Sequence, residues 1–366
     1  MKKSAKFITV CAIITAIGIM LMTAGFFLGA RITGFGFNSD GFHVYTLQTA
    51  EQATRHTANQ SKEDTVVLDA FENIDLKADC ANVKIIPSDH FGLSSRLGER
   101  DILDYSIEGN TLSITEKSHA QAGSTGPSFC WFYVGPDYTQ TECSEPYIEI
   151  CLPESASLGK VSLESGYGNM YFSGFTVSEF SLFNDYGDVK LKDINADSLQ
   201  LEMECGSLAA EKVTGDNLNL TNEYGTVDFT EVTVKDQARL LLESGSFIIR
   251  DSAFRTLTVE SSYGDVTGNT LSCAEGNLTL ESGNCSLKNF TTDHLRVDSD
   301  YGDVTLSLTA PADAYAYDLF TDYGSIEADG RSMKDRSHYI SGEDAAGNKG
   351  QITVSCESGD ISIRNP

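Results

Sequence analysis

Apolar and polar residues alternate over most of the chain beyond its first third. Apolar pairs such as Leu199/Leu201 precede a glycine, and a further apolar residue such as Leu208 follows two positions after that glycine. A period of two is typical of β-strands, whereas an amphipathic helix repeats every 3.6 residues. The pattern therefore predicts very short strands separated by turns.

These strands belong to an internal repeat. Successive central glycines are separated by 19, 19, 19, 20, 19, 19, 19, 22 and 35 residues. The glycines are Gly168, Gly187, Gly206, Gly225, Gly245, Gly264, Gly283, Gly302, Gly324 and Gly359. One unit of this size cannot bury its apolar face, but stacked units bury a continuous core. We therefore expect an all-β fold, a right-handed β-solenoid (single-stranded β-helix) with one repeat per coil.

The residue before the glycine alternates in size along the middle of the array. The series is Tyr186, Cys205, Tyr224, Ser244, Tyr263, Ser282 and Tyr301. Either these side chains pack inside the solenoid, or they form an aromatic ladder on its surface that binds sugars. Their parity with the preceding apolar pairs favours the inside, so we expect them to pack in the core.

The N-terminal region predicts a membrane anchor. Residues 7–30 contain no charged side chain and are long enough to cross a hydrocarbon core of about 30 Å as a helix. Three lysines lie in residues 1–6, so the positive-inside rule places this tail in the cytoplasm and the rest of the chain outside. A cleaved signal peptide is the alternative, although its apolar core is usually about 7–15 residues long. We expect residues 31–65 to be a polar tether and residues 66–366 to form the solenoid domain.

Residues 66–160 continue the same frame less regularly. They contain F-x-x-I-x-L at Phe71–Leu76, V-x-I-x-P-S-D at Val83–Asp89, G-N-T-L-x-I at Gly109–Ile114 and I-x-I-x-L-P at Ile148–Pro153. Together with the Gly-Asp-Val coils, this series resembles the bacterial putative-adhesin domain of unknown function with β-strand repeats. The resemblance implies a single-stranded β-helix in an envelope protein with a short membrane anchor, and it brings no established catalytic residues.

Two segments depart from the repeat. Residues 116–145 form a predicted loop insertion that holds Trp131, Phe132 and Tyr133, the candidate contact residues, because loops carry function more often than scaffold strands do. Cys130 and Cys143 lie in the same loop and are the candidate disulfide pair. Cys80, Cys205 and Cys285 occupy positions predicted to face inward, where cysteine packs as a small apolar residue. Residues 330–349 are expected to be a second loop before a last coil.

The net charge of the chain narrows the range of functions that it can have. The chain has 26 basic and 53 acidic residues, a net charge of -27, which argues against binding nucleic acid because phosphates need a basic surface. Aspartates flank several corner glycines and are candidate Ca²⁺ ligands, although aspartate also simply suits such turns. These candidates are Asp185, Asp188, Asp265, Asp300 and Asp303. No other cofactor is expected.

The sequence contains no C-x-x-C, no His/Cys cluster and no G-x-S-x-G motif. We therefore expect a non-enzymatic, membrane-anchored envelope protein that displays an acidic solenoid for adhesion or for binding an envelope protein or a glycan. The alternatives are an envelope-stress or regulatory accessory protein and, third, a carbohydrate-active enzyme on a β-helix.

Overall fold

The computed structural model describes residues 32–38, 41–46, 62–98, 101–117, 129–130, 146–328, 330–334, 337–341 and 350–366. The chain divides into two compact units, one of residues 1–61 with 119–144 and one of residues 62–118 with 145–366. No helix within the described ranges is long and apolar enough to span a membrane. The predicted transmembrane segment 7–30 and the tail before it lie outside those ranges.

The first unit contains a small antiparallel sheet. In it, β1 (Ile32–Asn38) pairs with β2 (Gly41–Thr46) and with β9 (Phe129–Cys130). The sequence pattern did not indicate these strands, because β1 and β2 fall in the expected tether and β9 in the expected loop insertion. Trp131, Phe132, Tyr133 and Cys143 lie outside the described residues, so the contact loop and the disulfide stay predictions.

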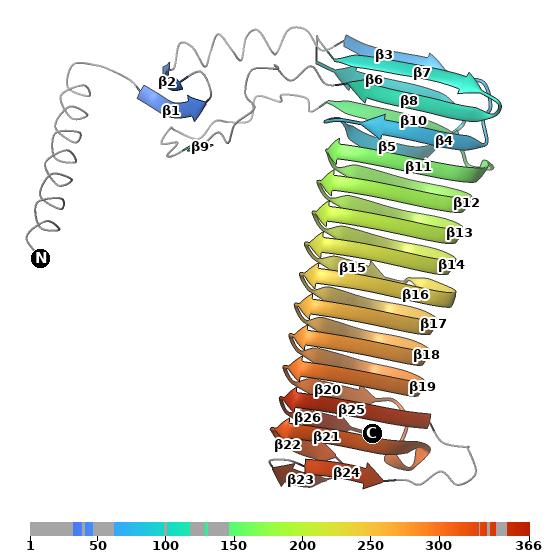
Figure 1. The fold of residues 1–366 in the computed structure, drawn as a ribbon. Coiled ribbons are helices and arrows are strands. Elements are labelled where there is room, and N and C mark those ends of the chain that lie inside the picture. The colour runs from blue at the N-terminus through green and yellow to red at the C-terminus, as the bar shows by residue number, and fades with distance from the viewer. Residues whose placement is uncertain are drawn as a thin grey trace, which may run out of the picture. The chain divides into compact units, whose positions relative to one another are not determined.

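The second unit is a β-solenoid whose coils stack in parallel (Figure 1). Leu199 of one coil pairs with Leu218 of the next, and in later coils Leu257 pairs with Gly276. The regular strands are β11 (Ser157–Tyr167), β12 (Met170–Tyr186), β13 (Val189–Cys205), β14 (Leu208–Tyr224), β15 (Val227–Thr230), β16 (Thr233–Ser244), β17 (Phe247–Tyr263), β18 (Val266–Ser282) and β19 (Cys285–Tyr301). The predicted all-β solenoid with its 19-residue register is confirmed.

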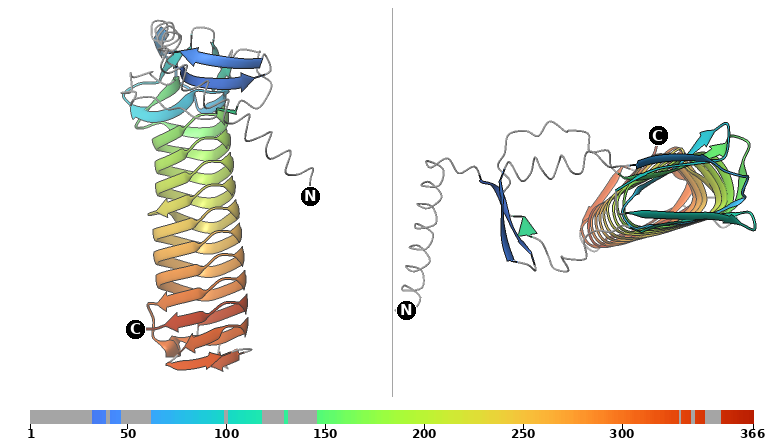
Figure 2. Two further views of the ribbon diagram at one scale, coloured as in Figure 1. Left: turned by 90° about the vertical axis from the view of Figure 1, so that its left-hand side faces the viewer. Right: turned by 90° about the horizontal axis from the view of Figure 1, so that it is seen from above.

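The core is a set of side-chain columns inside the coils. Leu199, Leu201 and Val189 are each only 1% exposed, as the alternation predicted. The hollow outline in the axial view of Figure 2 is therefore filled by these side chains. Burying one such aliphatic side chain contributes about 1.5–3 kcal/mol, so each coil is stabilised mainly by its neighbours.

The N-terminal end of the solenoid is built from mixed strands. Parallel pairing joins β4 (Asn73–Ala78) to β11 and β8 (Thr111–Lys117), and β5 (Asn82–Ser88) to β12 and β10 (Tyr147–Pro153). Antiparallel strands then complete the end: β3 (Lys62–Val67), β6 (Gly92–Leu97) and β7 (Ile102–Glu108). Cys80 takes the place of the corner tyrosine, as predicted, because Ser165 pairs with Ala78 and Tyr167 donates its backbone N–H to the carbonyl of Asp79 (2.8 Å), a register that sets Cys80 beside Tyr167.

A buried carboxylate closes this end. Glu116 is 2% exposed, and its Oε2 accepts hydrogen bonds from the backbone N–H groups of Asp79 (2.6 Å) and Cys80 (2.9 Å). It follows Leu112 and Ile114 at the inward positions of β8, where the repeat predicts an apolar residue. The side chain thus supplies acceptors to a corner where β8 ends and no regular coil follows.

At the C-terminal end of the solenoid, the coils do not stack in the order in which they occur in the sequence. The remaining elements are β20 (Val304–Leu308), the 3-10 helix η1 (Ala312–Ala314), β21 (Tyr315–Tyr323), β22 (Ser325–Ala328), β23 (Arg331–Lys334), β24 (Ser337–Ser341), β25 (Gly350–Ser358) and β26 (Ile361–Arg364). Ser358 of β25 pairs with both Tyr301 and Tyr323, so the last coil of the sequence lies between two earlier ones. The segment 330–349, expected as a loop, contains β23 and β24, which pair antiparallel with β22 and β21.

Candidate binding edge of the solenoid

The corner glycines form one column along the solenoid. Gly187 has φ = 132° and Gly206 has φ = 146°, a backbone region that side-chain-bearing residues rarely adopt. A Cβ on Gly206 would lie 2.0 Å from the carbonyl oxygen of Gly187. The backbone N–H of Gly187 in turn donates to the carbonyl of Cys205 (3.0 Å). Glycine is therefore required both by the turn and by the close approach of adjacent coils.

The tyrosines before these glycines are exposed, which corrects the expectation that they pack in the core. Tyr186 is 45% exposed and Tyr301 is 63% exposed. The last inward side chain of the coil is Asn184, two residues earlier, and the backbone then turns at Gly187. Because the turn ends the regular pleat, the period-two parity no longer places Tyr186 inside. The aromatic ladder on the surface, the alternative interpretation, is the correct geometry.

We call the surface formed by the two residues before and the one residue after each corner glycine the corner edge. Along it, aromatic and small residues alternate in spatial order. From β11 onward the order is Tyr167, Tyr186, Cys205, Tyr224, Ser244, Tyr263, Ser282, Tyr301, Ser358 and Tyr323. Ser358 restores the alternation because β25 inserts between β19 and β21. Only Tyr167 and Tyr186 are neighbours, and their rings stack with centroids 5.0 Å apart.

A second column inside the solenoid follows the same alternation. Three residues before the glycine, the tyrosine coils carry a small polar residue: Ser165, Asn184, Asn222, Ser261, Ser299 and Thr321. The other coils carry an apolar residue there: Met203, Leu242, Leu280 and Cys356. Several of the polar side chains donate to corner carbonyls, such as Asn184 Nδ2 to Gly187 O (2.8 Å) and Thr321 Oγ1 to Gly359 O (2.9 Å). The structural repeat is therefore two coils long, with a tyrosine coil and a small-residue coil.

The corner edge is acidic. From three residues before to two residues after the glycine, the ten corner segments contain twelve Asp or Glu and no Lys, Arg or His. In the small-residue coils the residue two before the glycine is always glutamate: Glu204, Glu243, Glu281 and Glu357. These glutamates were not among the residues predicted from the sequence, although the recurring Glu-Ser-Gly and Glu-Cys-Gly tripeptides mark them. Within the part of the chain that the structure describes, none of the four side chains forms an ion pair or a hydrogen bond.

Three of the calcium candidates have a structural role at the turns. A carboxylate oxygen accepts a hydrogen bond from a backbone N–H of the adjacent coil in Asp188 (from Ser207, 2.8 Å), Asp265 (from Asn284, 2.8 Å) and Asp303 (from Asp360, 2.8 Å). This is the turn-stabilising role that the alternative interpretation predicted.

Asp185 and Asp300 lie two residues before their glycines, on the outward side. The five candidates are thus spread over several coils. No group of three or more metal-binding side chains occurs among the described residues.

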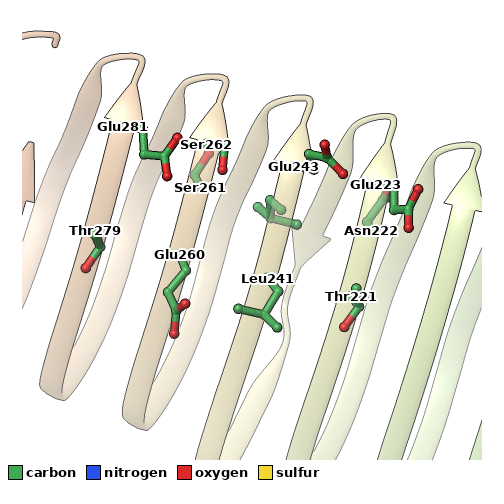
Figure 3. Close-up of a pocket in the computed structure, with 11 residues that line it drawn as sticks. Thr221, Asn222, Glu223, Leu241, Glu243, Glu260, Ser261, Ser262, Thr279 and Glu281 are labelled. Atoms are coloured by element: carbon green, nitrogen blue, oxygen red, sulfur yellow. The ribbon is translucent and has the colours of Figure 1, made fainter. Parts of the chain in front are cut away.

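A shallow groove crosses the neighbouring strands β14, β16, β17 and β18 beside the corner edge (Figure 3). Its volume is about 510 Å³, and Glu223, Glu243 and Glu281 line it near the corners, with Leu241 and Glu260 further along the strands. Glu260 is neutralised by Arg239 at 3.0 Å, whereas the three corner glutamates have no such partner in the described ranges. The groove is therefore most negative next to the tyrosines.

The cysteines divide between core and edge. Cys285 is 1% exposed, as predicted, and burial raises the pKa of its thiol to about 12. Cys80 and Cys205 were also expected inside, but both are half-buried at corner positions. Cys205 and Tyr167 are the main causes that raise the pKa of Tyr186, followed by desolvation and then by the charges of Glu204 and Asp185. The negative charges on this edge thus disfavour ionisation of the Tyr186 hydroxyl.

Comparison with known proteins places the chain in a family. No curated protein matches it. A crystal structure titled as that of a putative cell adhesion protein from Clostridium sporogenes aligns with 84% of this chain and all of that chain, at 11% identity and a TM-score of 0.22. The Toastrack DUF4097 family matches residues 71–240 and 210–364, which together include nearly the whole solenoid. The chain belongs to the Toastrack DUF4097 family.

Proposed function

We propose that this chain is a membrane-anchored envelope protein whose acidic β-solenoid acts by binding, in adhesion or in assembly with another envelope component. The apolar segment 7–30 serves as the anchor, residues 1–6 stay in the cytoplasm, and the solenoid is displayed outside. The charge distribution supports this topology, because the lysines of the tail precede the apolar segment.

One observation carries the binding role: the exposed tyrosines of the corner edge. Tyr224, Tyr263 and Tyr301 are 52–63% exposed in the chain, although each ring presents a large apolar surface. Aromatic side chains are enriched in binding surfaces because they combine a rigid apolar face with a polar group. Here they recur along the coils instead of occurring singly, as a surface that contacts an extended partner requires.

The topology is tested by fusing a reporter that is active only outside the cytoplasm after residue 366. Activity in the fusion, together with protease digestion of the solenoid on intact cells, is the expected result. A protected solenoid would overturn the proposed display.

The binding role is tested with cells that display the full chain. Attachment to plates coated with purified envelope proteins or cell-wall glycan is compared with that of cells displaying a Tyr224→Ser, Tyr263→Ser, Tyr301→Ser variant. We expect attachment by the wild-type chain and at least a several-fold loss in the variant at equal surface amounts. A variant that lacks residues 119–144 measures the contribution of the Trp131 loop. Attachment that neither variant reduces, or no attachment at all, would contradict a binding role.

A further inference from the structure

The alternation along the corner edge leaves four slots between tyrosines. Each slot has a small residue as its floor and a tyrosine coil on either side. The floors are Cys205, Ser244, Ser282 and Ser358. Adjacent strands lie about 4.8 Å apart, so tyrosines two coils apart are separated by about 9.6 Å.

The width of a slot suits a cationic side chain. The stacked rings of Tyr167 and Tyr186 deviate from parallel by only 4°, which shows how neighbouring rings orient on this edge. Rings in this orientation face one another across a slot, and a group midway between them lies about 4.8 Å from each. A cation is attracted to an aromatic face within about 6 Å of the ring centre, so it contacts both walls at once.

The charge at the slots selects a cation over other occupants. Each floor residue directly follows one of the unpaired glutamates Glu204, Glu243, Glu281 and Glu357. Basic side chains elsewhere on the coils pair with acids away from the corners, as in Lys192–Glu211 (3.7 Å) and Lys235–Asp216 (2.9 Å). A neutral sugar makes no use of the glutamate charge, and a second copy of this chain brings the same net charge of -27 to the contact.

We propose that the corner edge binds an extended basic segment of a partner protein, whose lysine or arginine side chains enter successive slots between the tyrosine rings. This inference rests on the proposed binding role and names the chemistry of the partner. The glutamate beside each slot pairs with the entering cation, and the groove beside Glu223, Glu243 and Glu281 holds the rest of the segment.

The spacing of the slots also predicts the spacing of the basic residues. A polyproline II segment rises about 3.1 Å per residue and has three residues per turn, so every third side chain lies on one face at about 9.3 Å. This interval matches the slot spacing of about 9.6 Å, whereas alternate side chains of a β-strand are only about 6.7 Å apart. The preferred partner sequence therefore carries a basic residue at every third position.

The test uses the full chain in mild detergent and three synthetic 15-residue peptides. The first is five repeats of Lys-Pro-Pro, the second has the same five lysines grouped at one end, and the third replaces lysine with glutamine. Calorimetry is expected to show at least tenfold tighter binding of the spaced peptide than of the grouped one, and no binding of the glutamine peptide. Equal affinity for the two lysine peptides would overturn the proposed register.

Two variants separate the slots from general electrostatics. Glu243→Gln with Glu281→Gln removes two slot charges, and Asp197→Asn with Glu275→Gln removes two exposed charges away from the corner edge. We expect at least a tenfold loss for the first pair and less than a twofold loss for the second. Equal losses would reduce the interaction to non-specific attraction and contradict the proposal.

A third variant fills the slots without changing the charge. Ser244→Tyr with Ser282→Tyr adds aromatic rings and closes two of the four slots, so binding of the spaced peptide is expected to fall at least tenfold. Unchanged or tighter binding in the folded variant would show that the slots are not the site. If no lysine peptide binds while cell attachment still depends on the tyrosines, this inference fails and the proposed function stands.

Discussion

The ring of Tyr186 stacks on that of Tyr167 in the next coil, with centroids 5.0 Å apart and an interplanar angle of 4°. The same column contains Ser244 between Tyr224 and Tyr263, where no ring fills the space. A tyrosine in place of Ser244 would occupy the same backbone position in its coil as Tyr224 and Tyr263 do in theirs. Its ring can therefore stack on both of their rings.

We therefore predict that Ser244→Tyr folds and stabilises the chain by about 0.5–1.5 kcal/mol, the usual contribution of an aromatic pair. Urea unfolding followed by far-UV circular dichroism measures the change. Thr279→Tyr, on the outward side of β18 and away from the tyrosine column, is the control and is expected to change stability by less than about 0.5 kcal/mol. A destabilised Ser244→Tyr variant would show that the column does not accept a continuous stack.

Substitution of a corner glycine is predicted to be severe. In Gly206→Ala the new methyl group would lie 2.0 Å from the carbonyl oxygen of Gly187, so two coils must separate. Gly109→Ala is the matched control, because Gly109 also has positive φ (54°) but nothing within 4 Å of the added Cβ. We expect the control to cost about 1–2 kcal/mol, the penalty of left-handed backbone, and Gly206→Ala to cost clearly more. Equal losses of stability in the two variants, measured by thermal unfolding, would mean that the close contact between coils is not what requires glycine at position 206.

A second corner of the solenoid carries strained residues that are not glycine. Thr270 has φ = 57° and Asn289, in the next coil, has φ = 51°. Asparagine tolerates this region much better than a β-branched residue does. We predict that Thr270→Asn stabilises the chain by about 0.5–1 kcal/mol and that Asn289→Thr destabilises it by a similar amount. Changes of opposite sign in the free energy of unfolding of the two variants, measured by chemical denaturation, support this account. A loss of stability in Thr270→Asn contradicts it.

The carboxylate of Glu116 is predicted to stabilise the N-terminal end of the solenoid. Glu116→Gln keeps the shape of the side chain but replaces charged acceptors of the Asp79 and Cys80 N–H groups with a neutral amide. Hydrogen bonds to charged groups contribute about 1.5–3 kcal/mol, so we expect a loss of about 2 kcal/mol. Glu108→Gln, on the exposed side of β7, is the control. Faster hydrogen exchange at residues 79–81 in Glu116→Gln alone would locate the effect.

The coil register followed from the sequence because each coil obeys the same local rule. An inward residue such as Leu199 stays inward as long as the strand is continuous, and its partner Leu218 is then one repeat away. The rule failed at Tyr186, because a turn through a glycine with positive φ changes the direction of the side chain and ends the alternation. The alternation of tyrosine with small residues was thus predicted as a sequence pattern, but not its place on the surface.

The order of the last coils depended on information that the local pattern lacks. A strand such as β25 has the same apolar alternation wherever it pairs, so that alternation does not specify that β25 lies between β19 and β21. The size of Ser358 was the available signal, because a small residue fits between Tyr301 and Tyr323 in the alternating column. Glu116 had a comparable signal, a charge at an inward position after Leu112 and Ile114.

Two buried thiols predict how stability depends on alkaline pH. Burial raises the pKa values of Cys285 and Cys356 from an ordinary 9.0 to about 12, because the interior disfavours the thiolate. The folded chain therefore holds these protons more tightly than the unfolded chain does. The resulting stability is complete below pH 9 and is lost as the pH rises from 9 towards 12, since only the unfolded chain releases the protons there.

Cys285→Val tests this dependence, because Val266 and Val304 occupy the same inward column in neighbouring coils. We expect the variant to lose stability less steeply than the wild type between pH 9 and pH 11, by up to about 1.4 kcal/mol per pH unit. Cys205→Ser, at the half-buried edge position, is the control. In a parallel experiment at pH 8, iodoacetamide followed by peptide mass spectrometry is expected to label Cys205 in the native chain, and Cys285 and Cys356 only after unfolding. Rapid native labelling of Cys285 would contradict its place in the core.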